Sequence, residues 1–291
     1  MRIAFLGLGQ MGTAIAKHLL RSGERPTVWN RTRSHAEALT GEGAAVAATP
    51  AEAVKEAEVV FTMLMDDRAL EEVLDQGGVF ERLPKGAIHV AMSTLSVALS
   101  KKLEEEHHRR GQQYVAAPVF GRPHIAEAGK LWVAVGGAEE PVEKVRPLLQ
   151  KFSRGLTLVS EHPWSAHALK LGGNFLITAM IAGLSEALVY AEGMQIEPAT
   201  FLETVNNALF QSKFYEMYGG IMLHPPEKPG GTIAIGEKDT RLFREAAESG
   251  GVATPLADQF YANFQRAIEA GMKDQDWAAG YLQLQRAGNR S

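Results

Sequence analysis

A lysine and an asparagine stand four residues apart in the apolar segment His167-Ala-Leu-Lys-Leu-Gly-Gly-Asn-Phe175. In a helix this spacing places Lys170 and Asn174 on the same face. Lys170 is the only lysine or arginine between Arg154 and Lys213, and leucines flank it. A lysine in such surroundings must reach out to solvent, pair with an anion or face a functional cleft.

An amine in a functional cleft can exchange a proton with a substrate oxygen. Reduction of a carbonyl group needs an acid for the developing alkoxide, and oxidation of an alcohol needs a base for its hydroxyl. Desolvation and a nearby oxidised nicotinamide would lower the pKa of Lys170 and bring it into the range of that exchange. We therefore predict Lys170 as the general acid/base, with Asn174 hydrogen-bonded to the lysine or to the substrate oxygen. The alternative is a lysine that extends to solvent at the start of a helix.

A glycine-rich string near the amino terminus predicts the cofactor. Gly7-Leu-Gly-Gln-Met-Gly12 follows the apolar run Ile3–Leu6, opens a helical pattern and precedes the second run, Thr27–Trp29. Gly7 permits a tight turn, Gly9 lets the backbone approach a pyrophosphate, and Gly12 allows helix and strand to pack closely. We expect the loop residues to bind a dinucleotide: Gly7, Leu8, Gly9, Gln10, Met11 and Gly12.

The end of the second run predicts which dinucleotide binds. An acidic residue there would bond the ribose 2′-hydroxyl of NAD, whereas this chain reads Asn30-Arg-Thr-Arg33. Arg31 can neutralise a 2′-phosphate and stack on adenine, and Asn30 and Thr32 can supply further donors. The sequence therefore predicts a preference for NADPH. Met63 and Leu64, at the end of a later run, are further expected cofactor contacts.

The sequence has two parts with different patterns of apolar residues. Up to about Leu158, short apolar runs alternate with helical patterns, which predicts a parallel sheet built of βαβ units. After Pro163 the patterns are helical, and the first expected helix, Ser165 to Met194, is apolar nearly all round, which indicates burial. We predict an α/β Rossmann domain over residues 1–163 and an all-α domain for substrate binding and dimerisation over residues 164–291, joined by that long helix.

Composition excludes several function classes. The 291 residues contain no cysteine, and 30 Lys+Arg balance 34 Asp+Glu, so neither thiolate chemistry nor a polyanion partner is indicated. Of the nine histidines, His107 and His108 lie in a charged run, and His162 and His167 have no carboxylate or cysteine company at ligand spacing, so we expect no metal. The run Lys101 to Arg110 is interpreted as a solvated helix face. We expect a cytoplasmic protein without nucleic-acid or membrane partners.

The motifs together resemble the β-hydroxyacid dehydrogenases, the group that contains 3-hydroxyisobutyrate dehydrogenase and glyoxylate/succinic semialdehyde reductases. The similarity runs through the chain and adds Ser93-Thr94, Ala117-Pro-Val119 and Lys238-Asp239 to the glycine loop and the Lys170 segment. The resemblance implies that Thr94 and Lys238 contact the cofactor, that Lys170 is catalytic and that Asn174 assists it. It also implies substrate binding near Ser93, an active site between two domains, and a homodimer or homotetramer.

One departure from the family concerns the substrate. After Ala117-Pro-Val the family usually has Ser-Gly-Gly, which holds the substrate carboxylate, and this chain has Phe120-Gly-Arg-Pro123. Phe120 adds an apolar wall, Gly121 retains an amide donor, and Arg122 is a candidate carboxylate partner or a solvent-exposed side chain. A substrate bulkier or more apolar than a three-carbon hydroxyacid is therefore expected.

Three functions are compatible with these residues. The first is an NADP(H)-dependent oxidoreductase acting on a small aldehyde, ketone or β-hydroxyacid. The second is an imine reductase on the same fold, which Lys170 argues against and Phe120 leaves open. The third is a cofactor-binding protein without turnover. Among the aromatic residues, Phe210, Phe214 and Tyr218 are candidates for the substrate pocket, and His124 and His167 are interpreted mainly as surface residues.

Overall fold

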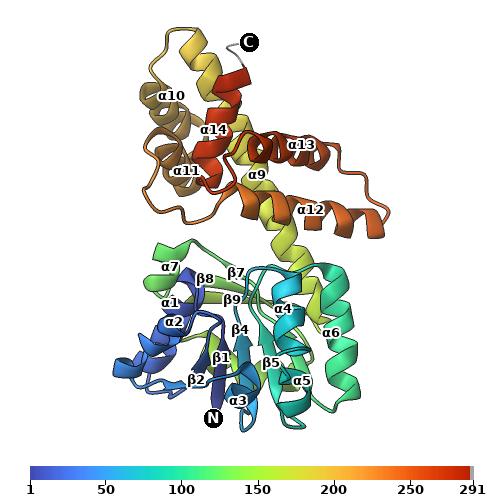
Figure 1. Cartoon of the computed structure of the whole chain (residues 1–291). Helices are drawn as coiled ribbons and strands as arrows, with labels where there is room; N and C mark the ends of the chain where they lie inside the picture. Colours follow the sequence, from blue (N-terminus) through green and yellow to red (C-terminus); the bar gives the residue numbers. More distant parts are fainter. Residues whose placement is uncertain (289–291) are drawn as a thin grey trace. The chain divides into compact units, whose positions relative to one another are not determined.

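The computed structural model describes residues 1–288 and divides the chain into two compact units (Figure 1). The first unit is Met1–Lys170 and the second begins at Leu171. A Rossmann domain, a long helix and an all-helical domain follow one another along the chain, as the sequence predicts. The sequence predicts a domain boundary after residue 163, at the start of the long helix, which begins at Pro163. The two compact units divide after Lys170, within that helix.

A mostly parallel sheet forms the centre of the first unit. The strands are β1 (Ile3–Leu6), β2 (Thr27–Trp29), β3 (Ala45–Val46), β4 (Val59–Thr62), β5 (Ile88–Ala91), β6 (Gln113–Ala116), β7 (Val119–Phe120), β8 (Leu131–Gly136) and β9 (Ser153–Ser160). Their order is β3-β2-β1-β4-β5-β6-β8-β7, and β9 pairs with β8. The direction of succession reverses between β1 and β4, and ligands of open α/β sheets bind at the carboxyl ends of strands at such a point.

Both faces of the sheet are buried, which explains why its strands read as continuous apolar runs. Ile3 and Phe5 of β1 contribute to a core on one face, and Ala4 and Leu6 contribute to a core on the other. Helices cover the two faces, as Figure 1 shows. They are α1 (Gln10–Arg21), α2 (Arg33–Glu37), α3 (Pro50–Val54), α4 (Asp67–Leu74), α5 (Val79–Arg82), α6 (Val97–Arg109), α7 (Pro123–Glu127) and α8 (Glu139–Leu149), with the single 3-10 turn η1 (Thr40–Glu42).

The second unit is helical. It contains most of α9 (Pro163–Gly193), then α10 (Pro198–Val205), the π-helical turn η2 (Asn206–Phe210), α11 (Lys213–Leu223), α12 (Ile233–Ser249), α13 (Pro255–Glu269) and α14 (Trp277–Gly288). Its core gathers residues of α9, α11, α13 and α14 around Phe264 and Tyr281. Helix α9 is long and apolar enough to cross a membrane by those criteria alone, but half of its apolar window is buried within the protein.

Several local features of the structure go beyond what the sequence predicts. Helix α10 ends at Val205 and the chain continues as η2, after which Gln211 adopts a positive φ of 47°. Helix α12 begins at Ile233, because the Thr232 side chain caps it by accepting a hydrogen bond from the Ile235 amide. The short strands β3 and β7 were not predicted, since two residues carry no periodicity.

The charged run on α6 is not wholly a solvated face. His107 is fully buried together with Leu103, one turn before it, while His108 is exposed. His167, interpreted from the sequence as a surface residue, is also fully buried. Both corrections have one cause, because a histidine at helical spacing from apolar residues lies on the inner face whatever its neighbours in the sequence are.

Candidate active site

The three loop glycines meet different surroundings. A Cβ added at Gly7 would lie 2.3 Å from the Met63 carbonyl oxygen, and one at Gly12 would lie 2.0 Å from the Gly7 carbonyl oxygen. A Cβ at Gly9 would meet nothing within 4 Å. Gly7, at φ +99°, and Gly12 are therefore required by the packing of the chain itself, whereas Gly9 leaves open space above the backbone.

This open space adjoins the amino terminus of α1. Gly9 is the N-cap of that helix, and no side chain accepts a hydrogen bond from its first amides. Uncapped amides and the positive end of the helix dipole attract an anion. The loop thus fits the pyrophosphate of a dinucleotide, with room where the ligand must approach and no room where the strand and helix must pack.

Asn30 fastens the end of β2 to this loop. Its Oδ1 accepts a hydrogen bond of 2.8 Å from the Leu8 amide, and its Nδ2 donates to the Thr32 carbonyl at 2.9 Å. His35 adds a ring-nitrogen contact to the Leu8 carbonyl at 3.1 Å. The side chain that the sequence suggests as a phosphate donor is thus committed to positioning the loop.

The two arginines that follow Asn30 differ in their contacts. Arg33 is paired with Glu37 at 2.7 Å. Arg31 is exposed, and within residues 1–288 its guanidinium has no hydrogen-bond or ion-pair partner. Arg31 is therefore the guanidinium available to a ligand at the end of β2.

Ser93 supports the loop from the other side. Its Oγ accepts a hydrogen bond of 2.8 Å from the Leu64 amide, and the residue is buried. Met63 and Leu64 in turn pack against Gly7, so Ser93 holds in place the segment that shapes the glycine turn. This arrangement gives Ser93 a structural task that differs from the expected substrate contact. Thr94, the expected cofactor contact beside it, is half-buried.

Lys170 is buried, with an exposed fraction of 8%, and its Nζ lies 4.3 Å from the centre of the Phe120 ring. The residue lies on α9 and the ring on β7, both within the first unit. The alternative of a lysine extended into solvent does not hold. Gly121, at φ +141°, turns the chain directly after Phe120, and Arg122 then stands at the N-cap position of α7.

Asn174 belongs to the second unit and contacts a buried carboxylate there. Its Nδ2 donates to the Asp239 Oδ2 at 2.6 Å, and the Lys238 Nζ lies 3.1 Å from the Asp239 Oδ1. A carboxylate paired with an ammonium can only accept, so the amide nitrogen of Asn174 must face it and the amide oxygen is left to accept from another donor. Asp239 was not predicted as a site residue, since it lies 65 residues from Asn174.

A chain of buried polar side chains runs behind β4 and β5. Thr62 Oγ1 lies 2.8 Å from His89 Nε2, His89 Nδ1 lies 2.8 Å from His107 Nε2, and His107 Nδ1 lies 2.9 Å from Gln112 Oε1. The Gln112 Nε2 donates hydrogen bonds to the carbonyl oxygens of Phe80 and Leu83. The Gln112 Oε1 must then accept a hydrogen bond from His107 Nδ1. With both imidazoles neutral, His107 Nε2 accepts from His89 Nδ1, and His89 Nε2 accepts from the Thr62 hydroxyl.

Both imidazoles of this chain are neutral by virtue of their surroundings. Burial lowers the pKa of His107 to about 4, and the hydrogen bond from His107 to Gln112 opposes that change. Burial, with the neighbouring His107 and His167 adding to it, lowers the pKa of His89 well below its ordinary value. His167 continues the buried polar group, since its Nε2 lies 3.5 Å from the Tyr114 hydroxyl.

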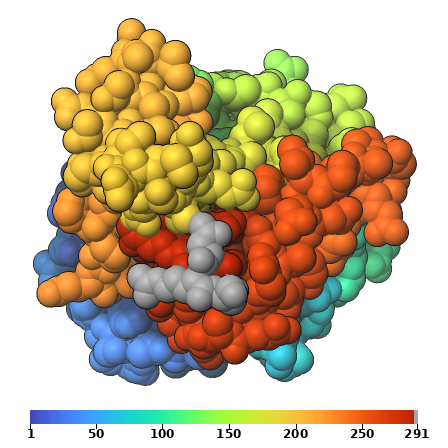
Figure 2. All heavy atoms as spheres, turned by 90° about the horizontal axis from the view of Figure 1, so that it is seen from above, coloured from blue at the N-terminus to red at the C-terminus, as the bar shows by residue number. Residues whose placement is uncertain are grey.

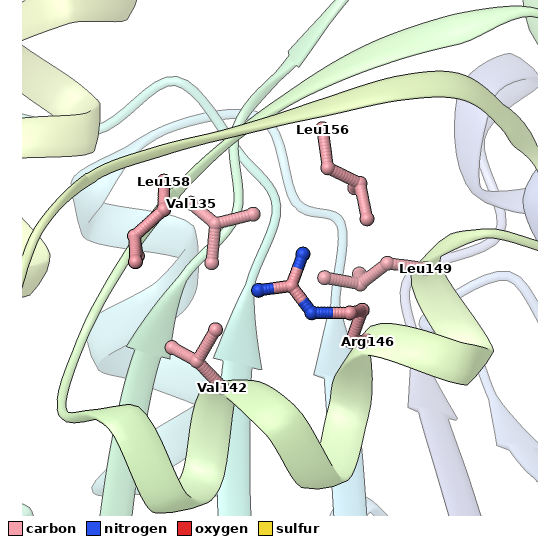
Figure 3. Close-up of a pocket in the computed structure, with 6 residues that line it drawn as sticks. All are labelled: Val135, Val142, Arg146, Leu149, Leu156 and Leu158. Carbon is pink, nitrogen blue, oxygen red and sulfur yellow. The ribbon is translucent and has the colours of Figure 1, made fainter.

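The aromatic candidates of the second unit form stacked pairs. The Phe210 and Tyr215 rings lie 4.1 Å apart, and the Phe214 and Tyr218 rings lie 6.0 Å apart. Tyr218 is buried, while Phe210 and Phe214 are exposed. In the first unit, Figure 3 shows a small apolar pocket between α8 and the β8–β9 pair, with the Arg146 guanidinium lying across it. None of the predicted site residues lines that pocket.

Comparison with known proteins identifies the family. Residues 2–160 match the NAD binding domain of 6-phosphogluconate dehydrogenase, and residues 165–283 match the NAD-binding domain of NADP-dependent 3-hydroxyisobutyrate dehydrogenase. The chain belongs to the β-hydroxyacid dehydrogenase family. An uncharacterized oxidoreductase of Bacillus subtilis, YfjR, shares 40% identity over 96% of this chain and 98% of its own length.

Two further relatives extend the comparison. Glyoxylate/succinic semialdehyde reductase 1 of Arabidopsis thaliana is 30% identical over 96% of each chain. The crystal structure of 3-hydroxyisobutyrate dehydrogenase from Salmonella typhimurium superposes with a TM-score of 0.87 at 23% identity, covering 98% of this chain and 99% of the other. This β-hydroxyacid dehydrogenase is thus an oxidoreductase that uses a nicotinamide dinucleotide, as the sequence predicts.

Proposed function

We propose that this β-hydroxyacid dehydrogenase interconverts a small aldehyde or ketone and the corresponding alcohol or β-hydroxyacid, with NADP(H) as cofactor and Lys170 as general acid/base. The observation that carries the proposal is the buried side chain of Lys170 on α9, in the same unit as the glycine loop. We keep the functional division predicted from the sequence, with a cofactor domain over residues 1–163 and a substrate domain over residues 164–291.

The bound nicotinamide would supply a hydride to the substrate carbon or remove one from it. In the direction of reduction, Lys170 Nζ gives a proton to the carbonyl oxygen as negative charge develops there. In the direction of oxidation, the neutral amine takes the hydroxyl proton. Asn174 offers its amide oxygen as an acceptor, because Asp239 occupies its amide nitrogen, and this oxygen would orient an N–H or O–H group of the reacting pair.

The choice of NADP(H) over NAD(H) rests on Arg31. An exposed guanidinium directly after β2, without a partner in residues 1–288, suits a 2′-phosphate. Contacts from Gly9 to Gly12 to the pyrophosphate, and from Thr32, Met63, Leu64, Thr94 and Lys238 to the rest of the cofactor, belong to the same proposal.

The substrate proposal combines an apolar wall and a cation. Phe120, placed against Lys170, would contact the substrate carbon chain, and Gly121 and Arg122 follow it directly. Arg122 can bind a carboxylate in two-pronged fashion. The relative whose name specifies glyoxylate and succinic semialdehyde indicates the class of a short aldehyde acid, and Phe120 favours a longer or more apolar member of it.

The proposal is tested by following NADPH oxidation with semialdehydes, ketoacids, simple aldehydes and cyclic imines. We expect turnover of an aldehyde or ketone, and loss of about 100-fold to 10,000-fold in kcat for Lys170→Ala, the range that a general acid contributes. Lys144→Ala is the matched control, because Lys144 is an exposed lysine on α8 paired with Glu140, and it should retain activity.

Two outcomes of that panel would replace the proposal. Turnover of the cyclic imines alone would favour the imine reductase alternative. Tight NADPH binding without turnover of any compound, in wild type and Lys170→Ala alike, would favour the cofactor-binding protein without catalysis.

The wider setting that we propose is a homodimer or homotetramer in the cytoplasm, acting on a small molecule and not on nucleic acid or membranes. The net charge of −4 gives no electrostatic attraction to polyanions. Exposed apolar side chains concentrate in the second unit, which supports self-association.

A further inference from the structure

The side chain of Lys170 lies against an aromatic ring. Lys170 Nζ lies 4.3 Å from the centre of the Phe120 ring, within the distance at which the negative face of a ring attracts an ammonium. Phe120 is half-buried and Lys170 is buried, so water screens this attraction little.

The contact acts on one charge state of the lysine. The ring face attracts the ammonium through its quadrupole and does not attract the neutral amine in this way. Burial works in the opposite sense, since it disfavours the charged form. An aliphatic side chain at position 120 would bury Lys170 in the same way and would offer no such attraction, so the aromatic face makes the difference.

We propose that the Phe120 ring holds Lys170 in its ammonium form and thereby favours, near neutral pH, the direction in which the enzyme donates a proton. This inference rests on the proposed function and specifies its direction. In that direction the substrate C=O gains a hydride at carbon from the reduced nicotinamide, its π-electron pair moves to oxygen, and the oxygen takes the proton of Nζ. The products are the alcohol, the oxidised cofactor and a neutral amine, which regains its proton from solvent.

An enzyme leaves the overall equilibrium of its reaction unchanged. The Phe120 ring therefore changes only the pH at which the rate of reduction, or of oxidation, is highest. Reduction needs the ammonium and oxidation needs the amine. Stabilising the ammonium therefore widens the pH range of reduction and moves the onset of oxidation to higher pH.

Other titratable groups occur in the segments that flank Lys170 and Phe120, and they must be kept constant. His167 lies one turn earlier and contacts the Tyr114 hydroxyl on β6, and Arg122 follows Phe120 by two residues. One turn later, Asn174 is hydrogen-bonded to Asp239, which lies beside Lys238. Variants that change position 120 alone keep all of these groups, so differences between them report the ring.

The test measures the charge of Lys170 directly in the cofactor-free protein. Acetic anhydride acetylates only the neutral amine, and mass spectrometry of the peptide that contains Lys170 gives its labelling rate from neutral to alkaline pH. The maximum rate reports access to the amine, while the midpoint of the curve reports the balance between ammonium and amine. Access and charge are thereby separated.

Three substitutions at position 120 are compared with wild type. Phe120→Leu should lower the midpoint by about 0.4 to 1.5 pH units, which is the free energy of a cation–π contact expressed as a shift in pH. Phe120→Tyr should keep the wild-type midpoint. Replacement of Phe120 by trifluorophenylalanine, which keeps the shape and weakens the quadrupole, should give an intermediate midpoint and guards against a folding defect in the leucine variant.

The same shift should appear in kinetics, as a lower pH for the onset of alcohol oxidation in Phe120→Leu. A leucine midpoint equal to or above that of wild type would overturn the inference, as would a fluorinated ring that behaves as the natural one does. A shifted labelling midpoint in a protein that turns over no carbonyl compound would support the contact and overturn the proposed function alone.

Discussion

At the scale of single residues, the site separates positions that shape the chain from positions that are available to a ligand. Gly7 and Gly12 are fixed by the backbone that packs against them, and Gly9 is not. Asn30 and Ser93 hold the loop with hydrogen bonds to the Leu8 and Leu64 amides. Arg31 stands beside Asn30 without such a commitment in residues 1–288, so it can be changed without loosening the loop.

Arg31→Asp should therefore alter the choice of cofactor and little else. We expect wild type to bind NADPH at least about tenfold more tightly than NADH, because a charge-assisted contact to phosphate contributes more than RT ln 10. The variant should lose most of that preference or reverse it, as measured by fluorescence titration of both cofactors.

Arg33→Asp provides the matched control for Arg31→Asp. It introduces the same change of charge two residues away, at an exposed arginine that is paired with Glu37. Since exposed ion pairs contribute little, this variant should stay close to wild type. Equal affinities of wild type for NADPH and NADH would refute the prediction.

Sequence and structure agree unevenly at this scale. The glycine spacing and the isolated Lys170 were recognisable, because each depends on residues that are near in the chain. The role of Ser93 depends on a hydrogen bond across 29 residues, and that of Asp239 on one across 65. Such contacts are set by strand register and helix packing, which local spacing does not encode.

At the scale of elements, α6 carries a second, internal function beside its charged surface. His107 projects from its inner face to complete the polar chain that joins Thr62, His89 and Gln112 behind the sheet. The sequence pattern of this helix is dominated by charge, so its buried histidine could be found only once the orientation of α6 was known. This series of hydrogen bonds requires the imidazoles of His89 and His107 to be neutral.

This requirement predicts instability in acid. In the unfolded chain each histidine takes up a proton as the pH falls through 6.5, the ordinary value, whereas in the folded protein the pKa of His107 is about 4 and that of His89 is well below 6.5. The unfolded state then binds more protons, so the free energy of unfolding falls with falling pH. We expect the slope from the two groups to be steepest near pH 5.5, at most about 2.7 kcal/mol per pH unit, and smaller toward pH 6.5 and toward pH 4.5.

Urea unfolding at a series of pH values measures that slope. His107→Leu should reduce it by about half, whatever the lost hydrogen bonds do to the absolute stability. His108→Leu, at the exposed neighbour on α6, should leave it unchanged. Carboxylates with lowered pKa, such as Glu58 and Glu143, contribute mainly below this window. An unaltered slope in His107→Leu would show that the imidazole titrates normally in the folded protein.

At the scale of the whole molecule, apolar surface is unevenly distributed. The second unit exposes most of the large apolar side chains: Leu176, Tyr190, Met194, Ile196, Leu209, Phe210, Phe214, Val252 and Leu256. Six of them fall between Tyr190 and Phe214, a stretch of the chain that is coloured yellow to amber in Figure 2. Exposed apolar side chains concentrated in one stretch of a chain favour a protein interface there.

We expect the wild type to sediment as a dimer or larger species, and Leu209→Lys to shift it toward the monomer. Leu209 has an exposed fraction of 73%, so the substitution should not disturb the core of the unit. Leu158→Lys, at an exposed leucine on β9 of the first unit, is the control. Analytical ultracentrifugation over a range of concentrations decides the matter, and a monomeric wild type would refute the prediction.

The architecture itself was the most predictable feature. Alternating apolar runs and helical patterns specify a parallel sheet, and the long apolar pattern after Pro163 specifies α9, because both extend over many residues. The π-helical turn at Asn206–Phe210 was not predictable in this way, since it differs from an α-helix by one residue per turn of hydrogen bonding.

The two hydrogen bonds of the Asn30 side chain have a consequence for how the cofactor preference of such a protein can change. Because the hydrogen bonds that hold the glycine loop come from position 30 and the proposed contact to the 2′-phosphate comes from position 31, adjacent codons carry separable tasks. A substitution at position 31 can therefore change the proposed contact to the cofactor while Asn30 preserves the turn. Under this proposal, cofactor choice can change by substitution of one residue without loss of the hydrogen bonds that hold the loop.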